Sequence, residues 1–158
     1  MNKMKKAIYI LMALLTAGIV NAQNNEKATT KLSQYVARPG AVISMDEEMF
    51  TEKIYNEKES PNEWKYLGDK PCIIDFYTTW CGPCKRLAPV LETIAEKYDG
   101  LIRIYRIDAE KELKISRKFG IRSYPTLLFC PMNDKPQMAI GALPKNDIEK
   151  LIANILLK

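Results

Sequence analysis

The amino-acid sequence predicts an α/β fold in which helices cover both faces of a central β-sheet. One observation is an apolar, β-branched and aromatic run over residues 72–77, typical of a buried strand, with a helical pattern over 85–95 close behind it. Another is that strand and helix patterns alternate along the rest of the chain, which ends in an amphipathic helix over 147–157. This alternation is the pattern that a sheet covered on both faces requires.

Shorter elements are expected on both sides of this strand–turn–helix unit. A strand is predicted at 41–43 and a helix over 45–55, with Ser44 and Glu47 forming a capping box at its start. The elements expected downstream are a strand over 101–107, a helix over 109–119, and strands over 126–130 and 137–141. We assign residues 41–158 to one domain.

The composition is that of a soluble globular protein of one domain. The chain has 158 residues, of which 47% are hydrophobic and 27% charged. Its net charge is +5, but Lys3, Lys5 and Lys6 supply three of those positive charges, and +2 remains without them. We therefore expect no nucleic-acid partner. The chain has no histidine, which excludes a Cys-His nucleophile pair and any histidine-ligated metal.

The amino terminus has the features of a signal peptide over residues 1–22. A basic segment over 2–6 is followed by 14 mostly apolar residues over 7–20. Val20 and Ala22 are small residues at the positions that a signal peptidase reads, so cleavage is expected after Ala22. An uncleaved membrane anchor is the weaker alternative, because the apolar segment is short for a membrane span. The expected localisation is therefore periplasmic or secreted, with residues 23–40 as a polar arm or tether.

Two cysteines lie at the predicted turn between strand and helix, in the sequence Trp80-Cys81-Gly82-Pro83-Cys84. Unpaired backbone N–H groups and the helix dipole favour an anion at the helix start, so Cys81 should ionise more readily than a free cysteine. Cys84 lies one helical turn further, within reach of a disulfide to Cys81. A thiolate that attacks and a second thiol that resolves are the minimum equipment for thiol–disulfide exchange.

Together with three further segments, this motif resembles the thioredoxin family. The segments are Asp75-Phe76-Tyr77, residues 120–126 with Tyr-Pro-Thr, and residues 141–143, in the family's order and spacing. An isolated C-x-x-C is compatible with half a zinc site or a structural disulfide, whereas the four segments together are specific. The resemblance spans about residues 41–158. It implies a thioredoxin fold, with a mixed sheet centred on the strand 72–77.

The resemblance assigns roles to the residues of the motif and its surroundings. Cys81 would be an exposed thiol that attacks a disulfide, and Cys84 a more buried thiol that resolves the mixed disulfide, so that Cys81–Cys84 is the redox-active pair. Pro125 would be a cis-proline facing this pair, where the Tyr124 backbone can pair with an extended substrate segment. The other residues expected to bind substrate are Trp80, Gly82, Pro83, Tyr124 and Gly141, with Ala142 beside them.

Asp75 is a carboxylate in a strand that is otherwise apolar. Such a group is costly to bury unless it is paired or neutral, and the alternative is a surface-facing aspartate on an edge strand. The resemblance implies a buried acid behind Cys84, with a pKa raised by desolvation, that takes the proton of Cys84. Many family members pair this acid with a lysine, where this chain has Ile104. Arg103 and Arg106 are the candidates for a substitute.

The function that the resemblance implies is disulfide reduction in exported client proteins. Gly-Pro between the cysteines is the dipeptide of the reducing members. We expect a membrane thiol relay as electron donor, no cofactor, no metal and a monomer. The alternatives are a disulfide oxidase or isomerase, and a non-catalytic binding module with a thioredoxin-like surface.

Cys72 and Cys130 are not required by the family pattern. If their strands are antiparallel neighbours, as in the family, both cysteines lie at the end of the sheet away from Cys81. A directly opposed pair is within the distance that a disulfide spans, and an oxidising compartment would permit the bond. The register cannot be deduced from one sequence, and we favour two buried free thiols over a second disulfide.

Overall fold

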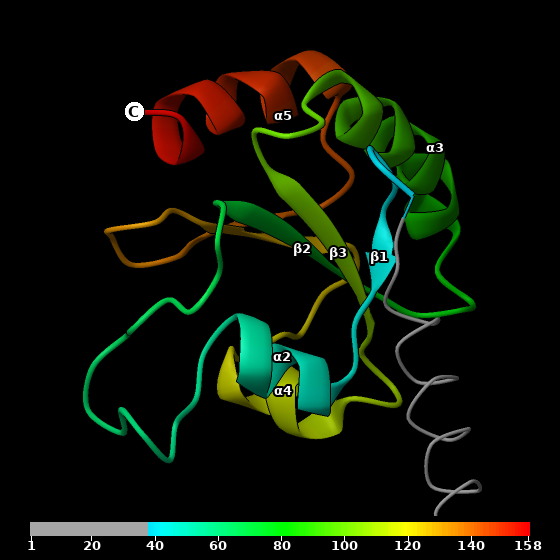
Figure 1. Ribbon diagram of the computed structural model, residues 1–158. Helices are drawn as coiled ribbons and strands as arrows, with labels where there is room; N and C mark the ends of the chain where they lie inside the picture. The colour runs from blue at the N-terminus through cyan, green and yellow to red at the C-terminus, as the bar shows by residue number, and fades with distance from the viewer. Residues whose placement is uncertain (1–37) are drawn as a thin grey trace, which may run out of the picture. The chain divides into compact units, whose positions relative to one another are not determined.

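The computed structural model describes residues 38–158, which form an α/β domain with a five-stranded mixed sheet (Figure 1). The predicted signal peptide, residues 1–22, lies outside the described residues, and so does the predicted arm apart from Arg38, Pro39 and Gly40. Within residues 38–158, no helix is long and apolar enough to cross a membrane.

The strands are β1 (Ile43–Ser44), β2 (Cys72–Tyr77), β3 (Arg103–Asp108), β4 (Thr126–Cys130) and β5 (Gln137–Ile140). They lie side by side in the order β1-β3-β2-β4-β5, so β2 is the central strand, as predicted. β1, β3 and β2 are parallel, whereas β4 pairs antiparallel with β2 and β5. The sheet is therefore mixed, and β2 is buried at every residue before Tyr77 because it has neighbours on both edges and helices on both faces.

The helices are α2 (Glu47–Lys53), α3 (Gly82–Lys97), α4 (Leu113–Lys118) and α5 (Lys145–Leu151), and α5 continues as the π-helical turn η1 (Ile152–Leu156). α3 and α5 cover one face of the sheet, and α2 and α4 the other (Figure 1). On the first face, Ile73 packs in one cluster with Leu91 of α3 and Ile148 of α5. On the second, the rings of Phe50 and Phe76 pack on Phe119, which directly follows α4.

Several predicted boundaries are wrong. The strand predicted at 41–43 is Ile43–Ser44 and the strand predicted over 101–107 is Arg103–Asp108, and two helix starts differ for a local reason. Ser44 does not cap α2, because it still belongs to β1; Asp46 is the cap, and its carboxylate accepts a hydrogen bond from the Met49 N–H at 2.8 Å. The helix predicted from 109 begins only at Leu113, because the N–H groups of residues 111 and 112 bond to Asp108 and close a turn. The last helix begins at Lys145 rather than 147.

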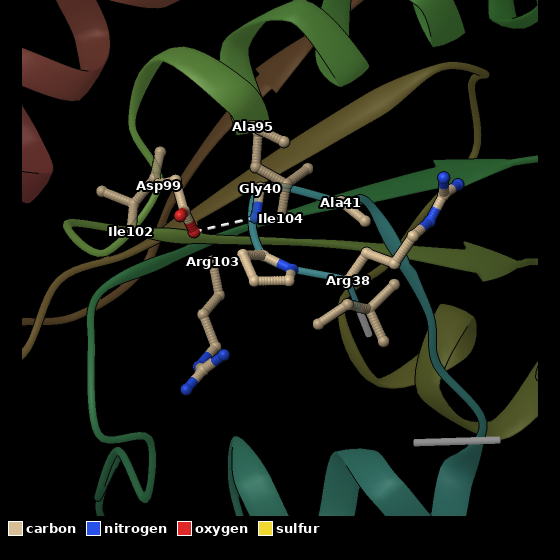
Figure 2. A pocket seen from close by; sticks show the side chains of 10 residues that line it. Arg38, Gly40, Ala41, Ala95, Asp99, Ile102, Arg103 and Ile104 are labelled. Atoms are coloured by element: carbon tan, nitrogen blue, oxygen red, sulfur yellow. Dashed lines mark hydrogen bonds between the residues drawn. The ribbon is translucent and has the colours of Figure 1, made fainter. Parts of the chain in front are cut away.

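The start of the described chain packs at the amino end of β3. The Gly40 N–H donates to Asp99 Oδ1 at 2.8 Å, beside a cavity of about 270 Å³ that Figure 2 shows. Gly40 has a φ of 70°, and a Cβ there would lie 3.1 Å from the Glu96 backbone, so this close approach favours glycine. Arg103, at the first position of β3, lines the cavity. The cavity thus lies at the opposite end of the sheet from Cys81, which follows the carboxyl end of β2.

Candidate active site

Cys81 and Cys84 lie where β2 ends and α3 begins, and they are joined by a disulfide with an S–S distance of 2.07 Å. Cys81 is the N-cap of α3, and its sulfur accepts a hydrogen bond from the Cys84 N–H at 3.1 Å. Pro83 occupies the first turn, where its missing N–H removes no helical hydrogen bond. The sulfur of Cys81 therefore receives a backbone donor and lies at the positive end of a 16-residue helix.

The two cysteines differ little in exposure. Cys81 is 4% exposed and Cys84 1% in the disulfide form. The resemblance implied an exposed Cys81, and that expectation is wrong for the disulfide form, in which the whole Cys81 residue is buried. What distinguishes the two sulfurs is their position in α3: Cys81 lies at the cap, whereas Cys84 lies on the inner face one turn below, with Leu87 and Leu91.

Asp75 lies on the face of β2 that α3 covers. Side chains alternate along a strand, so Asp75 shares this face with Ile73, which packs against α3. It is fully buried, and the surface-facing alternative is wrong. Desolvation by burial raises the pKa of the carboxyl group, and the charge of Arg106 partly offsets the increase.

Of the two candidate arginines, Arg106 pairs with Asp75. Its Nε donates to Asp75 Oδ2 at 2.9 Å, across the pair of directly opposed residues that joins β3 to β2. Arg103 instead binds both oxygens of the exposed Asp69, at 2.9 and 2.8 Å. Ile104, where we expected the position of the family's lysine, lies opposite Ile73 rather than Asp75 and is buried in the apolar cluster against α3, so that placement is wrong.

A hydrogen bond and a ring contact link several of the predicted substrate-binding residues at the end of the sheet near Cys81. The Tyr124–Pro125 bond is cis, as predicted, and the Gly141 N–H donates to the Pro125 carbonyl at 2.8 Å. Gly141 has a φ of 98°, a conformation that side chains disfavour. The rings of Trp80 and Tyr124 meet edge to face, with centroids 6.1 Å apart. Trp80 is 66% exposed, and Gly82 and Pro83 beside it are exposed too.

Glu110 is a residue of this region that we did not anticipate from the sequence. The Trp80 indole N–H donates to Glu110 Oε1 at 2.9 Å, which orients the exposed ring. The sequence contained a signal, since Glu110 lies two residues after the carboxyl end of β3, at the edge where parallel strands place functional groups. The sequence does not show that Glu110 contacts Trp80, because the two residues are 30 positions apart.

Cys72 and Cys130 are directly opposed in the antiparallel ladder of β2 and β4, a register that the sequence had left open. Both are fully buried and are free thiols in the structure. A hydrogen bond with Cys72, together with burial, raises the pKa of the Cys130 thiol. They lie at the start of β2, away from Cys81, and take no part in the site.

A disulfide at a helix start, with a buried carboxylate in the strand beneath and a cis-proline loop beside it, is the equipment of a thiol–disulfide oxidoreductase. Comparison with known proteins agrees. The thioredoxin family profile matches residues 41–154. A thioredoxin of Borreliella burgdorferi is 44% identical over 110 residues, which cover 70% of this chain and 93% of that protein.

Two further relatives are chloroplast proteins. An M-type thioredoxin of Spinacia oleracea is 35% identical over 98 residues, covering 60% of this chain and 54% of that one. The crystal structure of chloroplastic thioredoxin z superposes with a TM-score of 0.61 at 28% identity, covering 73% of this chain and 94% of the other. The chain belongs to the thioredoxin family, and it is a protein-disulfide reductase of the thioredoxin type.

Proposed function

We propose that this protein is exported and reduces disulfide bonds in exported client proteins. The observation that carries the reductase chemistry is the Cys81–Cys84 disulfide, with the Cys81 sulfur at the cap of α3. The basic and apolar segments of residues 1–22 support export, and cleavage after Ala22 would release a mature chain beginning at Gln23.

The reaction proceeds in two exchanges. The Cys81 thiolate attacks one sulfur of the client disulfide, forming a mixed disulfide while the other client sulfur leaves as a thiolate. Cys84 then attacks the Cys81 sulfur, which releases the client as a dithiol and leaves Cys81–Cys84 oxidised. Two electrons pass from the protein to the client. Asp75 takes the proton of Cys84 in the second step, supported by its burial on the face of β2 beneath α3.

The client docks on the exposed surface around the disulfide. Trp80, Gly82 and Pro83 are exposed on one side of it, and Tyr124 and Gly141 lie on the Pro125 loop. The Tyr124 backbone pairs with an extended client segment by β-addition. Glu110 belongs to this surface because it holds the Trp80 indole.

The direction of exchange is reductive. Gly82-Pro83 is the dipeptide of family members whose potentials lie near ~−270 mV, far below the ~−120 mV of strongly oxidising members. Continuous reduction outside the cytosol needs electrons from inside it, so we assign the donor to a membrane thiol relay. The protein acts as a monomer.

Reduction of insulin by dithiothreitol tests the activity. The protein should accelerate insulin precipitation, and Cys81→Ser should return the rate to that of dithiothreitol alone. Equal rates with and without the wild-type protein would instead indicate a non-catalytic binding module. Export is tested separately, by fractionation of cells and the intact mass of the mature chain. A chain that retains Met1 in the cytosol would contradict export without affecting the activity.

A further inference from the structure

Cys72 and Cys130 place two nucleophilic side chains together at the end of the sheet that lies away from Cys81. They are directly opposed in the antiparallel ladder of β2 and β4. The Cα atoms of such a pair lie about 4.5–5.5 Å apart, a separation that a disulfide spans. The two thiols share a hydrogen bond, and both residues are fully buried. This thiol pair therefore has the geometry of a second dithiol site that is closed to solvent.

The Tyr66 side chain covers the thiol pair. Tyr66 belongs to the segment that joins α2 to β2 (Figure 1). It shares a hydrogen bond with Cys72, and its hydroxyl donates to the Lys70 carbonyl at 2.6 Å. Tyr66 is half-buried, whereas Cys72 is fully buried. The tyrosine ring therefore separates Cys72 from solvent on this side.

Gly68 leaves the room that the Tyr66 ring occupies. A Cβ at Gly68 would lie 2.3 Å from the Tyr66 hydroxyl oxygen and 2.4 Å from the ring carbon that carries it, so the ring would have to move. Gly68 does not have a positive φ, so its backbone conformation is open to other residues. It is therefore the position of the Tyr66 ring that favours glycine here.

The segment over residues 66–70, which we call the lid, is attached near the surface of the domain. The Leu67 N–H donates to the Ile54 carbonyl at 3.0 Å. Asp69 accepts two hydrogen bonds from Arg103, and both of these side chains are exposed. An exposed ion pair adds little stability, because water screens it. Opening of the lid should thus cost less free energy than unfolding of the domain.

We propose that Cys72 and Cys130 are a second redox site, gated by the lid: the thiols stay free while Tyr66 covers them, and a low-molecular-weight disulfide oxidises them to an intramolecular disulfide when the lid opens. This site is separate from the Cys81–Cys84 disulfide, and the inference does not rest on the proposed function.

The oxidation takes place in two exchanges. Cys72, which the opening of the lid uncovers, attacks as a thiolate one sulfur of the small disulfide, and the other sulfur leaves as a thiolate. Cys130 then attacks the Cys72 sulfur as a thiolate and releases the second small thiol. Two electrons pass from the thiol pair to the small disulfide, and the two protons of the pair end on the two small thiols. The new bond cross-links β2 and β4.

Alkylation of the folded, oxidised protein with iodoacetamide measures the opening, because the active-site disulfide does not react. Gly68→Ala should speed alkylation of the thiol pair by more than about tenfold, since it displaces the ring as well as its hydrogen bond to Lys70. Tyr66→Phe loses only the hydroxyl, so its effect should be about tenfold at most. Tyr66→Ala removes the cover and provides a second variant. Equal rates in wild type, Gly68→Ala and Tyr66→Ala would overturn the lid.

A matched control separates opening of the lid from unfolding of the domain. Gly120→Ala introduces a side chain at a φ of 62°, in open space away from the lid, so it should lower stability and leave the alkylation rate unchanged. The wild-type rate should rise less steeply with urea than global unfolding does, because a local opening exposes less surface. A slope equal to that of global unfolding, or equal acceleration by Gly120→Ala and Gly68→Ala, would contradict a gated site.

Oxidised glutathione tests the chemistry of the open site. Gly68→Ala should lose the mass of two hydrogen atoms as the thiol pair becomes a disulfide, while wild type keeps two free thiols over the same period. Gly68→Ala combined with Cys130→Ser should instead gain one glutathione, on Cys72. Glutathione retained on both cysteines of Gly68→Ala, or no reaction in a variant that iodoacetamide alkylates, would overturn the second redox site.

Discussion

The Cys84 N–H donates a hydrogen bond to the sulfur of Cys81, 3.1 Å away, so the second cysteine of the motif contributes a donor to the first. In the reduced protein the same donor, together with the start of α3, stabilises a thiolate on Cys81. Cys84 does not occupy the N-cap of α3, because it lies within the first helical turn. The two cysteines are therefore chemically unequal, although their exposures are similar.

This inequality predicts the order of alkylation. Iodoacetamide added to the reduced protein at neutral pH should label Cys81 first, since the thiolate is the reacting species. Peptide mapping by mass spectrometry locates the label, and Cys81→Ser should lose the fast phase. Preferential labelling of Cys84 would reverse the proposed roles of the two cysteines.

Replacement of Asp75 by Asn should stabilise the protein at neutral pH. The pKa of Asp75 is raised in the folded state by burial, so the carboxyl group favours folding while it is protonated and disfavours it once ionised. The stability advantage of Asp75→Asn should thus be small below the unfolded-state pKa of about 4 and grow as pH rises through the folded-state value. Urea unfolding of the oxidised proteins at several pH values measures it, and an advantage that shrinks as pH rises would show the opposite shift.

Gly141 should be sensitive to substitution for a backbone reason. Its φ of 98° disfavours any side chain, although a Cβ there has open space around it. Gly141→Ala should therefore cost about 1 kcal/mol of stability or more, and should raise the KM for a client by disturbing the hydrogen bond to Pro125.

Gly100→Ala is the matched control for Gly141→Ala. Gly100 has a φ of 79° and equally open space, but it lies after α3 at the far end of the domain from the disulfide. It should cost similar stability in urea unfolding with no change in KM. Equal KM values for the two variants would show that Gly141 takes no part in client binding.

Cys72 and Cys130 should remain free thiols in the oxidised protein. Both are fully buried, and the raised pKa of Cys130 disfavours the thiolate that exchange requires. Thiol counting on protein unfolded after oxidation should find two thiols. A count of zero would mean that the directly opposed pair has formed a second disulfide, which its register permits.

The central strand and the helix after it were predictable because local patterns indicate them, and the cis-proline was predictable because its segment resembles that of the family. An apolar run, two cysteines with Gly-Pro between them and Tyr-Pro-Thr before a strand are each contiguous signals. The choice of Arg106 over Arg103 was not predictable, because it depends on which residue of β3 lies opposite Asp75. The Glu110–Trp80 hydrogen bond joins two loops that are distant in sequence. The cap of α2 was mistaken because Ser44 and Asp46 are both good caps, and only the end of β1 decides between them.

The account depends most on Cys81 as the atom that attacks the client, and trapping with Cys84→Ser tests this directly. Without the resolving thiol, the reduced variant should accumulate as a mixed disulfide with a disulfide-containing client such as insulin. Peptide mass spectrometry should place the client on Cys81, and dithiothreitol should release it. A matched Cys81→Ser variant that accumulates an equal adduct through Cys84, or a Cys84→Ser variant that forms none, would contradict the mechanism.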